Sequence, residues 1–466
     1  MKEAALPAGW TFATLSEIGE WRGGGTPSKS RREFWESGDI PWVSPKDMKR
    51  LTINSAKNQI TEHALAESAA SLVPTNSVLM VTRSGILQHT FPVAVNSVPV
   101  AINQDLKAWT PKGMDSLYAA YYLRAKQQEV LASCSKDGTT VSSIEFERLR
   151  RFPMPIAPQH EQQRIVSRIE ELFSKLDEGE RALERVQTLV ARYRQSVLKA
   201  AVTGELTHGW RARHASEPSQ SAGDDSTTSL PAGWAWTTVV RAGEVRLGRQ
   251  RAPQHHQGEH MRPYLRVANV YEDRLDLTDV KEMNFTPKEF ETYTLKPGDI
   301  LLNEGQSPEL VGRPAMYRGE VPGCCYQKTL LRFRARPGVL PDFALLVFRH
   351  YLHSGRFRRS ANITTSIAHL AAERFEPIEF PLPPQAEQAA IVDAASEMLE
   401  RLAHLEAELR AQRQASASLR QSVLNAAFSG RLVPQDATDE PASALLARLA
   451  AQAAETAPAP RRRARR

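Results

Sequence analysis

The chain has 466 residues, a hydrophobic fraction of 41%, and 60 Lys and Arg against 53 Asp and Glu, which gives a formal net charge of +7. This length predicts two to four domains with sizeable cores, and the hydrophobic fraction is ordinary for a soluble globular protein. No apolar run approaches the roughly 20 residues of a bilayer span and the N-terminus lacks a signal pattern, so we expect a cytoplasmic protein whose modest basic excess permits a polyanionic partner without requiring one.

Residues 1–153 are predicted to form a first globular α/β domain. The segment LPAGW lies at 6–10, and short β-rich runs follow at 39–45, 77–82 and 92–96, separated by Gly and Pro residues that favour turns. A helix with apolar residues between 117 and 123 completes the domain.

Residues 154–206 are predicted to form a long helix. Pro158 and Glu161 suit its first turn, and Gly204 suits the left-handed cap at its C-terminal end. Apolar side chains recur at alternating steps of four and three, which is typical of a coiled-coil seam. The predicted seam residues are Ile165, Ile169, Leu172, Leu176, Leu183, Val186, Val190 and Val197, with Tyr193 also in the pattern.

The remaining chain repeats this order. Residues 207–229 are polar and predict a flexible linker, 230–379 a second α/β domain, 380–433 a second long helix, and 434–466 a mobile basic tail with room for a short amphipathic helix around 441–455. The second seam is Ile391, Met398, Leu402, Leu405, Leu409, Leu419 and Val423, and Gln412 and Ser416 interrupt it.

The two halves are related by an internal duplication. The segment RQSVLKAAVTGEL at 194–206 and RQSVLNAAFSGRL at 420–432 are identical at nine of thirteen positions, at an offset of 226. The segment LPAGW recurs at 230–234, and within the globular domains the offset drifts, so that Gln104 is matched with Gln327 at an offset of 223. The helices have therefore diverged less than the domains.

This organisation predicts an α+β fold. Two duplicated α/β domains are separated by two long helices that form an antiparallel coiled coil, with approximate two-fold symmetry. Residues 165–200 alone would make a rod of roughly 54 Å, and a DNA turn spans about 34 Å, so two such domains could contact two half-sites. A coiled coil that only associates with other proteins remains an alternative.

The chain resembles the specificity (S) subunit of type I restriction-modification systems. The resemblance rests on GGGTPS at 23–28 with FWESGDIPWVSPKDM at 34–48, on the Pro-rich entries PIAPQHEQ and PLPPQAEQ, and on the helix ends AAVTGEL and AAFSGRL. It covers nearly the whole chain.

The resemblance implies a non-catalytic DNA reader with two target-recognition domains, each reading one half of a bipartite, asymmetric sequence. It implies that the helices set the spacer and dock two modification subunits, which methylate adenine from S-adenosylmethionine. Two motor-nuclease subunits that use ATP and Mg would complete the restriction complex. The chain itself is expected to bind double-stranded DNA and no cofactor or metal.

The sequence agrees with a subunit that delegates catalysis. It contains no Gly-x-x-x-x-Gly-Lys-[Ser/Thr] motif and no Asn-Pro-Pro-aromatic motif. The glycines at 23–25 favour a tight turn, and His255, His256, Glu259 and His260 favour a solvated or DNA-facing loop rather than a metal site. Cys134, Cys324 and Cys325 lack zinc spacing and are expected to be reduced, buried thiols.

Polar and basic side chains in loops after strands are the candidates for base and phosphate contacts. Solvated surface or local capping is the alternative for each of them. In the first domain they are Thr26, Ser28, Lys29, Lys46, Arg83, Ser84, Gln104, Thr139 and Thr140. In the second domain they are Arg249, Gln250, Arg251, Arg266, Asn269, Gln306, Ser307, Arg313, Gln327, Lys328, Thr364 and Thr365.

Three hypotheses follow from the sequence. The first is a specificity subunit that works with modification subunits. The second is a stand-alone regulator that binds a bipartite DNA site without partners. The third is a structural coiled-coil protein with only salt-sensitive, sequence-indifferent DNA binding.

Overall fold

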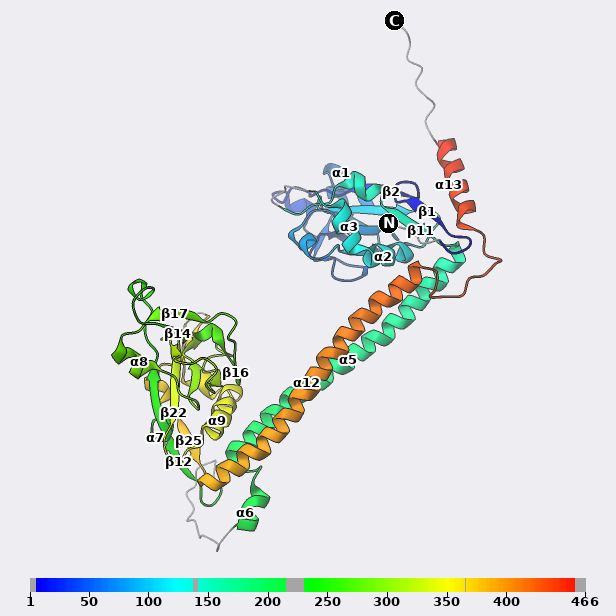
Figure 1. Cartoon of the computed structure of the whole chain (residues 1–466). Helices are drawn as coiled ribbons and strands as arrows, with labels where there is room; N and C mark the ends of the chain where they lie inside the picture. The colour runs from blue at the N-terminus through cyan, green and yellow to red at the C-terminus, as the bar shows by residue number, and fades with distance from the viewer. Residues whose placement is uncertain (1–5, 137–140, 215–229, 365, 457–466) are drawn as a thin grey trace. The chain divides into compact units, whose positions relative to one another are not determined.

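The computed structural model describes residues 6–136, 141–214, 230–364 and 366–456. The chain divides into two compact units (Figure 1). Unit 1 comprises residues 1–182 and 412–466, and unit 2 comprises residues 183–411. Each unit holds one globular domain together with part of each long helix.

The globular domain of unit 1 is built on two mixed sheets. One sheet has the strand order β2-β10-β7-β8-β4 and the other β5-β3-β9-β6, while β1 pairs separately with β11. The strands are β1 (Thr11–Thr14), β2 (Gly19–Gly23), β3 (Ile40–Val43), β4 (Thr52–Ile53), β5 (Asn58–Ile60), β6 (Leu72–Val73), β7 (Val78–Val81), β8 (Val93–Asn96), β9 (Val100–Ile102), β10 (Leu106–Pro111) and β11 (Pro153–Ile156). The helices are α1 (Glu62–Glu67), α2 (Ser116–Ala125), α3 (Gln127–Cys134) and α4 (Phe146–Arg150).

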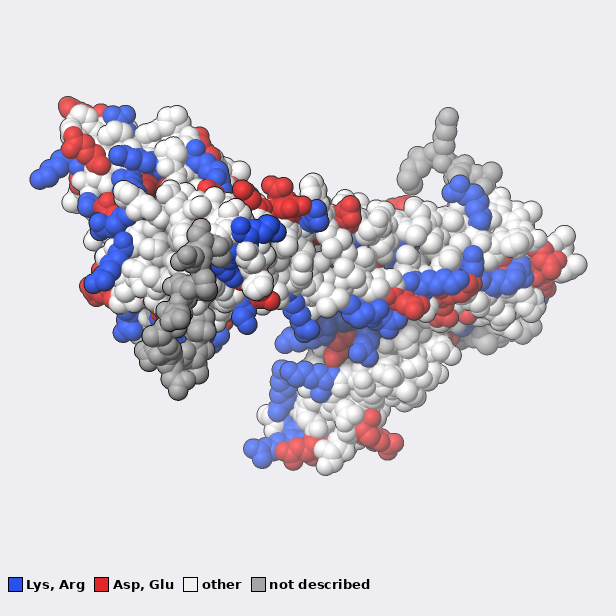
Figure 2. All heavy atoms as spheres, turned by 90° about the horizontal axis from the view of Figure 1, so that it is seen from below, with Lys and Arg blue, Asp and Glu red and all other residues white. Residues whose placement is uncertain are grey.

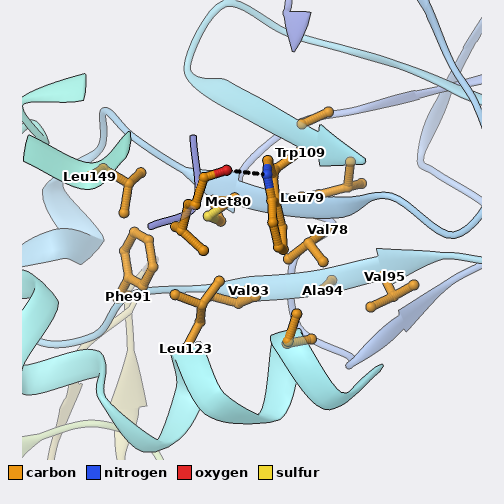
Figure 3. Close-up of a cluster of buried hydrophobic side chains, with 14 of the residues drawn as sticks. Val78, Leu79, Met80, Phe91, Val93, Ala94, Val95, Trp109, Leu123 and Leu149 are labelled. Carbon is orange, nitrogen blue, oxygen red and sulfur yellow. Dashed lines mark hydrogen bonds between the residues drawn. The ribbon is translucent and has the colours of Figure 1, made fainter. Parts of the chain in front are cut away.

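The core of this domain lies around β7 and β8 (Figure 3). Every residue of β7 is buried, as expected for an apolar run with neighbouring strands on both sides and side chains covered on both faces. Trp109 is fully buried beside it, and its indole Nε1 donates to the carbonyl of Leu15 at 2.9 Å. Helix α2 packs against β7 and β8.

The globular domain of unit 2 repeats the plan with more and shorter sheets. Their strand orders are β13-β22-β18-β20, β17-β14-β21 and β19-β24-β23, with the pairs β12-β25 and β15-β16. The strands are β12 (Ala235–Thr238), β13 (Gly243–Leu247), β14 (Met261–Leu265), β15 (Val270–Tyr271), β16 (Arg274–Leu275), β17 (Lys281–Asn284), β18 (Ile300–Asn303), β19 (Gly305–Gln306), β20 (Pro314–Met316), β21 (Cys325–Tyr326), β22 (Leu330–Ala335), β23 (Asn362–Ile363), β24 (Ala368–His369) and β25 (Glu379–Leu382). The helices are α7 (Val239–Ala242), α8 (Pro287–Tyr293), α9 (Pro341–His353), α10 (Arg356–Ser360) and α11 (Ala372–Phe375).

Strand register confirms that the two domains are copies of one α/β plan. In unit 1, β3 runs parallel to β9 with Trp42 opposite Ala101. In unit 2, β14 runs parallel to β21 with Tyr264 opposite Cys325. In both units the strand that follows pairs antiparallel on both sides, β10 with β2 and β7, and β22 with β13 and β18.

The same register corrects one predicted equivalence. The Asn103 N–H donates to the carbonyl of Val43, and the Gln327 N–H donates to the carbonyl of Leu265, each at 2.9 Å. Gln327 therefore corresponds to Asn103, and Gln104 corresponds to Lys328. The prediction that Gln104 matches Gln327 is wrong by one residue, because the two glutamines lie at adjacent and not at equivalent positions after the paired strands.

The two long helices form as predicted. They are α5 (Gln159–Thr203) and α12 (Gln385–Phe428), and Figure 1 shows them side by side. Each ends at a glycine with positive φ, 76° at Gly204 and 68° at Gly430, which is the left-handed conformation expected of these caps.

Within each unit the helices pair in antiparallel fashion. In unit 1 the first half of α5 packs against the last part of α12 through Ile165, Ile169 and Val423. In unit 2 the second half of α5 packs against the first part of α12 through Val190, Leu402 and Leu409. An antiparallel coiled coil is the arrangement that both contacts require.

The predicted seam is wrong at three positions. Val186, Leu405 and Leu419 are exposed, by 36%, 37% and 50%, because the four-three spacing also fits a stripe beside the contact line. Tyr193, also in the pattern, is 53% exposed. Where the second seam was interrupted, polar contacts replace apolar ones, and the Ser416 hydroxyl donates to Glu180 at 2.7 Å.

The entry of each long helix is tied to its own domain by a buried glutamate. In unit 1 the Trp10 indole donates to Glu161 at 3.0 Å. In unit 2 the Trp234 indole donates to Glu387 at 2.9 Å. The next residue of each helix also contacts its own domain. Gln162 accepts a hydrogen bond from the Asp115 N–H, and Gln388 accepts one from the Leu340 N–H.

Two predicted mobile segments contain ordered structure. Helix α6 (His208–His214) begins in the predicted linker, where Thr207 is 2% exposed and Arg211 pairs with Glu387. Helix α13 (Ala442–Thr456) lies in the predicted tail, and Ala442 and Leu445 are buried against unit 1. Helix α13 agrees with the short amphipathic helix predicted around 441–455, whereas the ion pair of Arg211 with Glu387 has no signal in the composition of the linker.

None of the described helices is long and apolar enough to cross a membrane. The three cysteines are free and buried, as predicted, and burial raises the pKa of Cys324 and Cys325 to about 12.

Candidate nucleic-acid interface

The glycine turn of unit 1 brings two predicted contact residues together. The Thr26 hydroxyl donates to the side-chain oxygen of Gln104. A Cβ on Gly24 would lie 1.9 Å from the Asn103 carbonyl oxygen, so only glycine permits this approach. In unit 2, Gly248 stands in the same relation to Gln327, with a distance of 2.2 Å. The turn is a shared frame that presents different side chains in each unit.

The other predicted residues of unit 1 lie at several places. Ser28 and Lys29 are exposed in the loop after the glycine turn. Lys46 is exposed after β3, and Arg83 is exposed after β7. Ser84 is half-buried, and its hydroxyl caps the following turn by accepting the Ile86 N–H. Thr139 and Thr140 lie outside the described residues.

Two predicted residues of unit 2 are buried and hydrogen-bonded within the domain. Arg249 is 6% exposed and donates from Nε to Glu289 at 2.8 Å. Asn269 is 2% exposed, accepts the Arg266 N–H, and donates to the carbonyl of Asp276 at 2.8 Å. Both side chains make these hydrogen bonds inside the domain.

Two further arginines of unit 2 are partly engaged. Arg266 pairs with Asp279, and 26% of its side chain is exposed. Arg313 lies over the Tyr271 ring, 4.7 Å from its centroid, and burial lowers its pKa.

The remaining candidates of unit 2 line its loops. Gln250, Arg251, Lys328 and Thr364 are exposed, while Gln306, Ser307 and Gln327 are half-buried. The Thr364 hydroxyl donates to the carbonyl of Ile367 at 3.1 Å, which also gives it a role in its turn. Thr365 lies outside the described residues.

A basic cleft in unit 1 adds residues that the sequence did not single out. The cleft, of about 710 Å³, lies between the globular domain and the helix pair of this unit. Lys46 and Ser84, both predicted, line it together with Lys49, Arg124 and Arg420. The last two come from α2 and α12, where a lone Arg in an amphipathic pattern gives no signal of a site.

The surface charge is distributed in patches. On the face that Figure 2 shows, Lys and Arg side chains gather in places, with Asp and Glu side chains among them. Among the described residues, His, Cys, Asp and Glu side chains form no group of three or more placed to hold a metal ion. The chemistry that these surfaces offer is hydrogen bonding and charge.

Comparison with known proteins identifies a domain in the first half of the chain. Residues 7–185 match the family model described as Type I restriction modification DNA specificity domain. This span covers the unit 1 globular domain and the first part of α5.

The relatives are specificity subunits of type I restriction enzymes. The chain is 42% identical over 167 residues to the EcoR124I/EcoR124II subunit of Escherichia coli, and 29% identical over 248 residues to the MjaIX subunit of Methanocaldococcus jannaschii. These alignments cover 36% and 52% of this chain, and the chain spans only 40% and 52% of the length of these two relatives. The EcoKI subunit of Escherichia coli is 22% identical over 468 residues, 97% of each chain.

Two solved structures share the fold. A chain from a structure concerned with complex assembly and conformational transition of the type I R-M system has a TM-score of 0.67 at 18% identity, covering 92% of this chain and all of that one. The HsdS subunit from Thermoanaerobacter tengcongensis has a TM-score of 0.54 at 19% identity, covering 92% of this chain and 99% of that one. The matched domain, and relatives that extend over almost the whole length, make the chain similar to type I restriction-modification specificity subunits.

Proposed function

We propose that the chain is the DNA sequence-recognition subunit of a type I restriction-modification complex. Each globular domain reads one half of a bipartite, asymmetric site on double-stranded DNA. The chain carries no catalysis of its own and acts in the cytoplasm. Two modification subunits methylate adenine with S-adenosylmethionine, and two motor-nuclease subunits use ATP and Mg for restriction.

The observation that carries this proposal is one frame with two different sets of side chains. Both units place a glycine against the strand end that holds Asn103 in unit 1 and Gln327 in unit 2. At the next position unit 1 presents Gln104 and unit 2 presents Lys328. A conserved frame with changed polar side chains is what reading two different half-sites requires, because base edges differ in their donor and acceptor patterns.

An exposed apolar stripe on the helices supports the docking of partner subunits. In unit 2 the helix α5 exposes Val186, Leu189 and Tyr193, by 36%, 59% and 53%, at spacings of three and four residues. Such a stripe on one face of a helix is typical of a surface that packs against another helix. Leu419 of unit 1, which corresponds to Tyr193 at the offset of 226, is 50% exposed. Unit 1 therefore keeps one apolar position of the stripe.

A domain exchange tests the proposal. Residues 16–150 lie between β1 and β11, so replacing them with the matching segment of another specificity subunit keeps that strand pair and the helix entry. Co-expressed with its modification subunits, the chimera should methylate a motif with one changed half-site and an unchanged second half. Methylome sequencing is the measurement.

The reciprocal exchange is the matched control. Residues 239–378 lie between β12 and β25, and replacing them should change the other half-site only. If both halves change in either chimera, the one-domain, one-half assignment is wrong. Tight binding of a bipartite site by the purified chain, with no methylation in the presence of modification subunits, would instead favour a stand-alone regulator.

A further inference from the structure

Each unit contains a cleft between its globular domain and its part of the helix pair, and the two clefts are copies. Cleft 1 is the basic cleft of unit 1, and cleft 2 is a cavity of about 390 Å³ in unit 2. Arg124, Phe173 and Arg420 line cleft 1, and Arg349, Leu399 and Arg194 line cleft 2. These three pairs are related by offsets of 225, 226 and 226, which are the offsets of the surrounding helices.

The structural contacts confirm the pairing of the two central arginines. Tyr118 of α2 stacks edge-on against Trp10, and Phe343 of α9 stacks edge-on against Trp234. Both helices therefore start in the same frame. Arg124 and Arg349 each follow six residues later without interruption.

The charge around these two arginines differs between the two units. Arg349 in cleft 2 is 5% exposed and is neutralised, since Nε pairs with Glu272 at 3.1 Å and an η nitrogen pairs with Asp273 at 2.8 Å. The other arginines of cleft 2 are also paired, Arg194 with Glu406 at 2.9 Å and Arg318 with Asp342 at 3.3 Å.

Cleft 1 keeps its positive charge. Arg124 is half-buried, and among the described residues no carboxylate pairs with it. Burial lowers its pKa, against a weaker opposing effect of Tyr121. Lys46 and Lys49 stand exposed at the rim, and no Asp or Glu is among the described residues that line the cleft. Arg420 is the exception, because it pairs with Asp177 and Glu180.

A single loop accounts for the difference. After the matched strands β3 and β14, the same capped turn forms in both units. Asp47 accepts the Ser44 N–H at 2.9 Å, and Asn269 accepts the Arg266 N–H at 3.1 Å. Counting on from that turn, Lys49 and Arg50 of unit 1 correspond to Tyr271 and Glu272 of unit 2. The loop that neutralises Arg349 in cleft 2 supplies Lys49 to the lining of cleft 1, and Arg50 follows directly outside that lining.

We propose that cleft 1 is a phosphate-binding site for the backbone of the DNA duplex, and that cleft 2 is not. The proposal rests on the proposed function and adds to it that sequence-independent anchoring is concentrated in unit 1. A half-buried guanidinium without a carboxylate is costly to desolvate, and a phosphate supplies the paired acceptor oxygens that its fork geometry fits. The lysines at the rim extend the positive field toward the backbone.

The test compares variants of the full chain in complex with its modification subunits. The variants are Arg124→Gln, Lys49→Gln and Arg50→Glu. The third variant introduces a carboxylate at the position of unit 1 that corresponds to Glu272 of unit 2. Loss of one phosphate contact should flatten the slope of log K against log salt by about 0.9, which is roughly a 5-fold loss of affinity at 0.15 M salt. The loss should be equal for site-containing and site-free duplexes, and the methylated motif should stay the same.

Lys112→Gln is the matched control, because Lys112 is an exposed lysine of unit 1 that pairs with Glu20 at 2.8 Å and does not line the cleft. It should leave affinity and slope unchanged. If Arg124→Gln lowers the melting temperature, its loss of affinity has a second explanation. Lys49→Gln then decides the test, because Lys49 is exposed and its substitution should leave the fold intact.

Three results would overturn the phosphate site. They are an unchanged affinity and slope in all three variants, a changed methylated motif, and loss of the modification subunits on purification, which would assign the cleft to an acidic protein surface. In each of these the parent complex still methylates a bipartite motif, so the proposed function stands. A parent complex that methylates no bipartite motif would remove both.

Discussion

Glu387→Gln is expected to lower the free energy of unfolding of unit 2 by about 3 kcal/mol, as for other broken buried ion pairs. Glu387 is 2% exposed and accepts from three donors, the Trp234 indole, the Thr207 hydroxyl and the Arg211 guanidinium. An amide has one acceptor oxygen and two N–H donors. Its nitrogen would face at least one of these donors and leave it buried without a partner.

The copy in unit 1 provides the control. Glu161 is 1% exposed and accepts a hydrogen bond from Trp10 through Oε2, while its Oε1 has no hydrogen-bond partner among the residues that the structure describes. Glu161→Gln can keep the bond to Trp10 and removes a buried charge, although its amide nitrogen takes the place of the unpaired Oε1, so unit 1 should lose less stability than unit 2 loses with Glu387→Gln. The two substitutions are chemically identical, and the difference comes from Thr207 and Arg211.

The control also has a predicted pH dependence. Burial raises the pKa of Glu161, against the Trp10 hydrogen bond and the charge of Arg164. The folded state therefore binds this proton more tightly than the unfolded state. The stability this proton contributes is fully present below the unfolded pKa and is lost as pH rises through the higher folded pKa. The free energy of unfolding of Glu161→Gln, relative to that of the parent, should thus be highest near neutral pH. This difference should become smaller in acid, where the parent binds the proton.

Hydrogen exchange resolved by segment is the measurement, because it reports opening of residues 230–382 and 6–156 separately. Glu387→Gln should speed exchange in the first segment only. Equal effects of the two substitutions on their own units would contradict the role assigned to Arg211 and Thr207.

Leu189→Asp combined with Tyr193→Asp is expected to weaken binding of the modification subunit by 100-fold or more, an order of magnitude typical of losing two large apolar anchors. Both side chains are more than half exposed on α5. The two Asp residues together lower the helix propensity by about 1 kcal/mol. At an apolar interface each carboxylate would be desolvated without a partner. Co-purification and titration of the complex measure the loss.

Ile367→Asp serves as the control, since Ile367 is also in unit 2 and is 48% exposed, but lies in the globular domain. It should leave the complex intact. Circular dichroism should show the same helix content in all three proteins. Retention of the modification subunit by the double variant would place the docking surface elsewhere on the chain.

The duplicated plan was readable from the sequence because its signals are local. The glycines at 204 and 430 and the apolar spacing each depend on neighbouring residues alone, and the two helix segments can be compared directly at the offset of 226. Spacing does not specify which of two adjacent stripes faces the partner helix, so Val186, Leu405 and Leu419 were placed in the seam although they are exposed.

The site was less readable because burial and pairing depend on distant residues. Arg249 and Asn269 are polar residues in loops, but Glu289 and Asp276 engage them inside the domain. Arg124 gave no signal, because its lack of a carboxylate partner depends on a loop that precedes it by about 75 positions. Sequence patterns indicated which loops carry polar side chains and could not predict which of these side chains stay exposed.

The capped turn after β3 and β14 has a consequence for how such subunits diversify. Because Asp47 and Asn269 hold the same turn in both domains, the few residues that follow can change sign without disturbing the strands. Under the phosphate-site proposal, backbone affinity and base preference are then carried by separate residues. A subunit could acquire a new target sequence in one globular domain while retaining the affinity for the DNA backbone that the other domain supplies.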